Sequence, residues 1–191
     1  MILYEGLSRI GFRPFTRTVL RLEISGAEHV PAAGPVILVA NHESIWDPFI
    51  LGVLTTRPIH YMAKAELFGY PVLRQVMHGF GAFPVDRGGG DMRALRHGID
   101  LLRRGEVLGV FPQGTSKQAA PRRFHRGAAR LALLTGAPIV PVRLTGTRGV
   151  LRPGLPKVTI EAQTPIEVEA ARATVAAAKG LTARLEEAIA T

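Results

Sequence analysis

Two side chains five residues apart, His42 and Asp47, form the pair in this sequence that is best suited to acid–base chemistry. The apolar run at 36–40 predicts a short buried strand ending just before His42, and Asp47-Pro48 predicts the start of a helix. A carboxylate that faces an imidazole selects one ring tautomer and stabilises the imidazolium that forms when the ring takes up a proton. The pair is the His-Asp part of a hydrolase triad without its serine, so we expect the nucleophile to arrive with a substrate.

The spacing of this pair also has a purely structural interpretation. A histidine followed five residues later by an aspartate arises readily by chance in a chain with six histidines, so the motif alone is weakly specific. Asp47 is also a good helix N-cap, and Pro48 is favoured at the first helical position. The catalytic interpretation therefore depends on the other motifs of the chain.

Length and composition bound the class of protein. A chain of 191 residues, 47% of them hydrophobic, is expected to form one globular domain with a substantial core. The sequence has no cysteine, which excludes disulfides and a thiol nucleophile, and we expect neither a metal nor a resident cofactor. No apolar run reaches the roughly 18 residues that span a bilayer. We also recognise no signal peptide, so a cytoplasmic protein is expected.

The net charge of +9 points to an anionic partner, such as a nucleic acid, a membrane surface or an acidic small molecule. The arginines are spread along the chain, and no zinc-finger, RNP-like or basic-zipper pattern is present, so we expect no nucleic-acid partner. A solvated basic surface without a specific partner is the alternative.

The segment at 2–20 combines aliphatic and aromatic side chains with regularly spaced arginines. This pattern predicts one or two short amphipathic helices, with a break near Pro14. Such helices bind membrane surfaces, although packing on the core of the domain fits the pattern equally well. We therefore divide the chain into a membrane-associating segment, 1–20, and a domain, 21–191.

The remaining pattern alternates strands with helices. Strands are predicted at 22–25, 36–40, 59–63, 81–85, 107–111, 139–144 and 158–162. Helices are predicted at 46–55, 66–78 with a break near Pro71, 91–104 with Asp91 as its cap, 127–135 and 169–190 with a weak point at Gly180. This order predicts a single-domain α/β sandwich with a largely parallel, mixed sheet flanked by helices.

Four short segments lie at or near predicted strand ends, where open α/β sheets bind ligands. Their sequences are NHESIWDP, GAFPVDR, FPQGTS and APIVPV. In this order and spacing they resemble the four motifs of the glycerolipid acyltransferases, specifically the 1-acylglycerol-3-phosphate acyltransferases. The resemblance covers roughly residues 20–165.

The resemblance implies a reaction and roles for the first pair. His42 matches the general base of the family, and Asp47 matches the residue that orients it. The nucleophile would be the free hydroxyl of 1-acylglycerol-3-phosphate, which would attack the thioester of acyl-CoA or acyl-carrier protein and give phosphatidic acid. The enzyme would then act as a peripheral (monotopic) protein at the cytoplasmic side of the cell membrane.

The resemblance also implies a set of substrate-binding residues. Arg87 matches a phosphate-binding arginine, whose planar fork suits that task, and Lys64 lies where the family often has a second phosphate contact. The third motif helps to form the acceptor pocket. The expected substrate-binding residues are Asn41, Lys64, Arg87, Gln113, Gly114 and Thr115.

The third motif departs from the family pattern, which usually has a glutamate at the position of Gln113 and an arginine at that of Ser116. Glutamine keeps a carbonyl acceptor but loses the charge. Lys117, Arg122 or Arg123 are candidates to replace the missing arginine. The departure leaves two alternatives open: a different lysolipid, lipid alcohol or lipid amine as acceptor, and a non-catalytic lipid-binding protein with the same fold.

Overall fold

The computed structural model describes residues 21–86, 91–114, 124–150 and 157–190, which form one mixed sheet of seven strands. The strand order is β1-β7-β6-β2-β5-β3-β4, and within these residues only β6 and β7 pair antiparallel. This confirms the predicted α/β fold with a largely parallel sheet. The strands are β1 (Glu23–Ser25), β2 (Val36–Ala40), β3 (Ile59–Lys64), β4 (Ala82–Val85), β5 (Val107–Val110), β6 (Ile139–Thr145) and β7 (Thr159–Ala162). The segment 1–20 lies outside the described residues.

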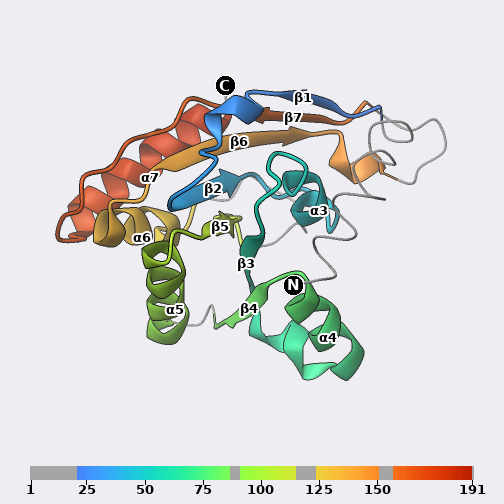
Figure 1. Cartoon of the computed structure of the whole chain (residues 1–191), viewed down its shortest axis with the longest axis horizontal. Coiled ribbons are helices and arrows are strands. Elements are labelled where there is room, and N and C mark those ends of the chain that lie inside the picture. Colours follow the sequence, from blue (N-terminus) through green and yellow to red (C-terminus); the bar gives the residue numbers. More distant parts are fainter. Residues whose placement is uncertain (1–20, 87–90, 115–123, 151–156, 191) are drawn as a thin grey trace.

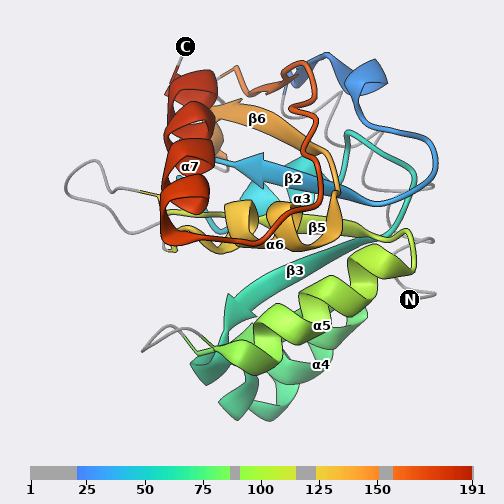
Figure 2. The same cartoon turned by 90° about the vertical axis from the view of Figure 1, so that its left-hand side faces the viewer.

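Helices cover both faces of the sheet (Figure 1). One face carries three of them, seen at the front in Figure 2: α5 (Met92–Arg103), α6 (Gly127–Thr135) and α7 (Val175–Ala190). The other face carries α3 (Asp47–Leu51) and α4 (Pro71–Gly79). Short 3-10 turns complete the described elements: η2 (Ala27–His29), η3 (Ala65–Gly69) and η4 (Thr147–Gly149). Two layers of buried side chains, one on each face, form the core.

The strand that leads to the site, β2, is central in the sheet. It pairs in parallel with β5 on one side and with β6 on the other. All five of its residues are buried, because both of its faces are covered by helices. An uninterrupted apolar run is typical of such a strand, and the predicted buried strand at 36–40 is confirmed.

Two helices are shorter than predicted. α3 ends at Leu51 and not at residue 55, and α7 starts at Val175 and not at residue 169. The segment before α7 is drawn out along the sheet, because Ile166 exchanges two backbone hydrogen bonds with Ile139. The helix then begins after Thr174, whose hydroxyl accepts the N–H of Ala177.

A glycine in β5, Gly109, leaves room for the ring of Tyr61, which comes from the neighbouring strand β3. A Cβ atom built on Gly109 would lie 2.6 Å from the ring of Tyr61, which is closer than any real contact. The Tyr61 hydroxyl donates to the carbonyl of Pro48 at 2.7 Å. The missing side chain at 109 therefore makes room for the ring that fixes the first turn of α3.

A partly buried histidine in β3, His60, should make stability depend on pH. Burial lowers the pKa of His60 below its usual value, against an opposing contribution from Glu106, whose carboxylate lies 3.9 Å from Nε2. The unfolded chain therefore binds a proton at a higher pH than the folded one. The contribution of neutral His60 to the free energy of unfolding should be fully present above about pH 6.5 and should fall as the pH drops toward the pKa of His60 in the folded chain.

We expect His60→Gln to flatten this dependence. The loss in the wild type should be about 1.4 kcal/mol for every unit by which the pKa is lowered. Urea unfolding between about pH 5 and pH 7.5 measures it, with exposed His78→Gln on α4 as the matched control. An equally steep profile in the His60→Gln variant would contradict this assignment.

Candidate active site

The site begins where β2 ends, at a side chain that ties two strands together. The Asn41 amide donates to the carbonyl of Leu144 at 2.8 Å and accepts the N–H of the same residue at 2.7 Å. Both ends of the amide are therefore occupied by β6. The structure shows Asn41 holding the strand end from which the next residue projects, and its expected contact with substrate stays a prediction.

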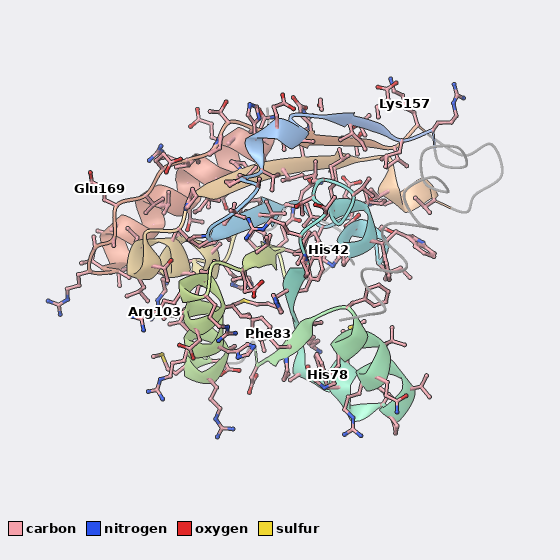
Figure 3. All side chains as sticks on the ribbon, viewed as in Figure 1. His42, His78, Phe83, Arg103, Lys157 and Glu169 are labelled. Atoms are coloured by element: carbon pink, nitrogen blue, oxygen red, sulfur yellow. The ribbon has the colours of Figure 1, made fainter. Side chains whose placement is uncertain are left out.

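His42 and Asp47 lie in direct contact, as the sequence predicted. Nδ1 of His42 lies 2.8 Å from Oδ2 of Asp47. A carboxylate can only accept, so Nδ1 carries the proton and Nε2 keeps its lone pair. The histidine side chain is 17% exposed and the aspartate is fully buried. Figure 3 shows His42 beside α3, at the end of the central strands.

The carboxylate of Asp47 also folds the loop around itself. The same Oδ2 accepts the N–H of Glu43 at 2.6 Å and that of Ser44 at 2.8 Å. Its other oxygen, Oδ1, is buried without a hydrogen-bond partner among the described residues. Asp47 is the first residue of α3, and Trp46 is its N-cap. The predicted capping role is thus wrong, because the carboxylate points back to the loop.

The third motif holds His42 from the other side. Oε1 of Gln113 accepts the backbone N–H of His42 at 2.5 Å. Gly114 has a left-handed backbone conformation, with φ at 76°, and closes a turn by donating to the carbonyl of Phe111 at 3.1 Å. Both residues lie at the site, and the observed role of Gln113 is to position the histidine.

A stacking partner of the histidine was not singled out from the sequence. The rings of His42 and Phe111 lie with their centroids 4.5 Å apart and their planes 28° apart. Phe111 follows directly after β5, so its place after a buried strand was the available signal. The stack fixes the imidazole plane, and the Asp47 hydrogen bond fixes its rotation.

The predicted phosphate-binding residues are only partly placed. Lys64 ends β3 at the same edge of the sheet as His42, and its ammonium lies 2.8 Å from the carboxylate of Glu66. Arg87 and Thr115 lie outside the described residues, as do Ser116, Lys117, Arg122 and Arg123. Their expected contacts stay predictions.

A cavity of about 570 Å³ opens beside the site, on the face of α5, α6 and α7. Phe111 lines it, so the ring that stacks on His42 also forms part of the cavity wall. Arg126 and Arg130 bring positive charge and Asp86 and Asp91 bring negative charge to the lining. The rest of the lining is largely apolar and includes Met62, Leu95, Val110 and Leu131. Its size is typical of small-molecule sites.

Asp91 also lines the cavity and caps α5, as predicted, by accepting the N–H groups of Arg93 and Ala94. Hydrogen bonds from the backbone N–H groups of Asp86 and Ala94 lower the pKa of this carboxyl group. Within the described ranges, no cluster of three histidine or acidic side chains has a geometry that would hold a metal ion.

A family model with the description "Acyltransferase" matches residues 21–145. The chain belongs to the acyltransferase family. The matched region contains His42, Asp47 and the third motif, and therefore the hydrogen-bonded pair and the residues that hold it. Membership confirms the resemblance that the four motifs indicated.

Curated relatives of this acyltransferase chain come from bacteria and plants. The 1-acyl-sn-glycerol-3-phosphate acyltransferase of Bacillus subtilis (strain 168) is 34% identical over 65% of this chain and 63% of its own length. The chloroplastic enzyme BAT2 of Brassica napus, with the same activity in its name, is 31% identical over 76% of this chain and 42% of its own. The lyso-ornithine lipid O-acyltransferase of Pseudomonas aeruginosa is 33% identical over 60% and 44%. The matches thus cover less than two thirds of the length of each of these relatives.

The fold is that of a solved member of the family. The crystal structure of the 1-acyl-sn-glycerophosphate (LPA) acyltransferase PlsC from Thermotoga maritima superimposes with a TM-score of 0.74. It covers 98% of this chain and 77% of its own, at 24% sequence identity. The likeness therefore supports the arrangement of sheet and helices.

The hydrogen bond between Gln113 and His42 gives a test within this acyltransferase site. We expect Gln113→Ala to lower kcat by about tenfold, because it leaves the partly buried N–H of His42 unpaired and frees the loop. Gln113→Glu keeps an acceptor oxygen and should retain most of the activity. Steady-state kinetics of the two variants at saturating acceptor measures the difference.

An effect of Gln113→Ala on the acceptor KM alone, with kcat unchanged, would contradict the positioning role and favour direct contact with the substrate.

Proposed function

We propose that the protein transfers a fatty acyl group from the thioester of acyl-CoA or acyl-carrier protein to the free hydroxyl of 1-acylglycerol-3-phosphate. The observation that carries the proposal is the His42–Asp47 pair with Nε2 left available. In the described part of the chain, no hydroxyl is hydrogen-bonded to the His42 ring, and the sequence has no cysteine. A base without a protein nucleophile is suited to activating the hydroxyl of a substrate.

The proton and the bonds can be followed through one turnover. The acceptor hydroxyl gives its proton to Nε2 of His42 as its oxygen attacks the thioester carbonyl carbon. Asp47, hydrogen-bonded at Nδ1–H, stabilises the imidazolium that forms. Collapse of the tetrahedral intermediate breaks the carbon–sulfur bond, and the leaving thiolate recovers the proton from Nε2. The products are an ester and a free thiol, and the base is restored.

The acceptor is the part of the proposal that the relatives support. Enzymes from Bacillus subtilis and Brassica napus are named for 1-acylglycerol-3-phosphate. The cavity offers two guanidinium groups to a phosphate, those of Arg126 and Arg130, in a lining that also holds Asp86 and Asp91. Arg87 and Lys64 are the residues we propose for its phosphate. Asn41 and Gln113 would then support the site from behind, by holding the strand end and the backbone of the base.

A second acceptor is favoured by one specific observation. Gln113 and Ser116 replace two residues of the usual third motif, and a relative named for lyso-ornithine lipid is about as similar as those named for 1-acylglycerol-3-phosphate. Loss of the arginine at position 116 removes a cationic phosphate contact, which suits an acceptor without a phosphate monoester. Another lysolipid, lipid alcohol or lipid amine therefore remains the runner-up.

The acceptor and product are lipids, so we also propose peripheral association with the membrane, with 1–20 as one attachment segment. No helix within the described residues is long and apolar enough to cross a bilayer.

Purified full-length protein should be incubated with radiolabelled acyl-CoA, or acyl-carrier protein, and a panel of lysolipids. We expect labelled phosphatidic acid from 1-acylglycerol-3-phosphate at a rate above those of lyso-ornithine lipid and other lysophospholipids. A faster rate with an acceptor that lacks a phosphate monoester selects the runner-up. No transfer from either donor to any acceptor, with tight lysolipid binding, selects the non-catalytic lipid-binding protein.

A further inference from the structure

Helix α4 carries an apolar stripe on the side that faces away from the domain. Its inner side packs normally: Met77 contacts the core, and Phe80 at its end makes an edge-on contact with Phe49 of α3. Val72 and Val76 lie four residues apart and so share another face, where they are 77% and 42% exposed. A surface helix with one buried stripe needs no second one.

Neighbouring side chains enlarge this stripe into a patch. Tyr70, 67% exposed, precedes the helix, and Leu67 is exposed on η3 just before it. Eight large apolar side chains are exposed among the described residues, and four of them fall in this short stretch, which points to a clustered surface and not to scattered exposure. We call Leu67, Tyr70, Val72 and Val76 the α4 surface.

The α4 surface begins at the edge of the sheet where the acyltransferase site lies. Lys64 ends β3, and η3 and α4 follow it directly. β3 is separated from β2 only by β5, so this edge lies roughly 10 Å from the end of β2. Figure 1 shows α4 and α3 on the same side of the sheet. Ile45, in the loop after His42, adds a further side chain that is 73% exposed.

The charge of this stretch is one-sided. No acidic residue occurs between Glu66 and Asp86, whereas Arg74 is exposed on α4, and the chain as a whole has a net charge of +9. His78 of α4 also lies in this stretch (Figure 3). Glu66, beside Leu67 on η3, is exposed, but its carboxylate lies 2.8 Å from the ammonium of Lys64. Apolar side chains with a basic residue among them, and with the one neighbouring carboxylate paired, suit a helix that lies in an anionic membrane interface.

We propose that the α4 surface is a lipid-contacting face, on which an anionic phospholipid bilayer docks with the active-site edge turned toward the headgroups. The inference rests on the proposed function only in that the acceptor is a lipid that must pass from this surface to His42. It assigns membrane contact to the folded domain itself, in addition to the segment 1–20.

The test uses full-length protein carrying Val72→Glu and Val76→Glu, and vesicles of phosphatidylglycerol and phosphatidylcholine. Both valines are exposed, so the fold should persist, which circular dichroism checks. We expect the variant to bind about tenfold more weakly in vesicle flotation, because two apolar contacts are lost and two negative charges face the bilayer. The matched control replaces two exposed apolar residues of α5 and α6, Met92→Glu and Leu134→Glu, and should bind within about twofold of wild type.

Activity separates this inference from the proposed function. With a short-chain, water-soluble acceptor the Val72→Glu, Val76→Glu variant should turn over like wild type, whereas with acceptor in vesicles it should be slowed about tenfold. If the wild type has no acyltransferase activity with any acceptor but the variant still loses vesicle binding, the lipid-contacting surface is upheld and the proposed function is refuted.

Three results would overturn the lipid-contacting face. One is unchanged flotation of the variant. A second is equal loss in the Met92→Glu, Leu134→Glu control, which would show that only net charge matters. The third is a wild-type dimer that the variant converts to monomer without loss of vesicle binding, which would make a second copy the occupant.

Discussion

Replacing His42 with alanine is expected to lower the rate of acyl transfer by about 10²–10⁴-fold while the domain stays folded. Nε2 of this ring is the proton acceptor in the proposed reaction, and no other described side chain hydrogen-bonds to Asp47. The loop should survive, because the Asp47 carboxylate keeps the N–H groups of Glu43 and Ser44. Initial rates under saturating donor and acceptor measure the effect.

His97→Ala is the matched control for this substitution. His97 contacts Phe83 edge-on, on the α5 face and away from the pair, so its removal should leave the rate unchanged. Near wild-type turnover of His42→Ala would refute the general-base mechanism.

Replacing Asp47 with asparagine should lower kcat by a comparable factor, about 10²–10⁴-fold, with little change in the acceptor KM. The amide can place its oxygen at the position of Oδ2, where it still accepts the three N–H groups, and its NH₂ at the position of Oδ1. The negative charge that stabilises the imidazolium is then gone, and the new donor is buried without a partner.

Asp100→Asn, an exposed carboxylate on α5, is the control for this second substitution. The double variant His42→Ala, Asp47→Asn should be no slower than His42→Ala alone, because the two side chains act as a unit. Additive losses would show that Asp47 contributes independently of the histidine.

The parts of the site that the sequence predicted are those in which the residue type fixes the chemistry. An unbroken apolar run predicted that β2 is a buried strand, and the histidine and aspartate beyond its end were found as a bonded pair. The roles of Asn41 and Gln113 were not predictable in this way. An amide serves a substrate and a backbone group equally well, and only the folded chain shows that Leu144 and His42 are the partners.

The same argument accounts for the misplaced helix boundaries. The alanine-rich pattern before residue 175 favours a helix, but the backbone N–H of Ala171 donates instead to the carbonyl of Leu133 in α6, after Ile166 has paired with Ile139. Long-range pairing of this kind leaves no local mark in the sequence. The stack of Phe111 on His42 escaped notice for a related reason, since the two residues come from different strand ends.

The direction of β1 has a consequence for how the protein can be tethered. β7 runs opposite to β6, and β1 runs parallel to β7, so β1 also runs opposite to β2. Its first residue, Glu23, lies in register with Thr159, which lies opposite Thr145 at the end of β6. The chain therefore enters the domain at the edge that holds His42. A segment that is attached there and binds a surface would hold the His42 edge of the sheet close to that surface.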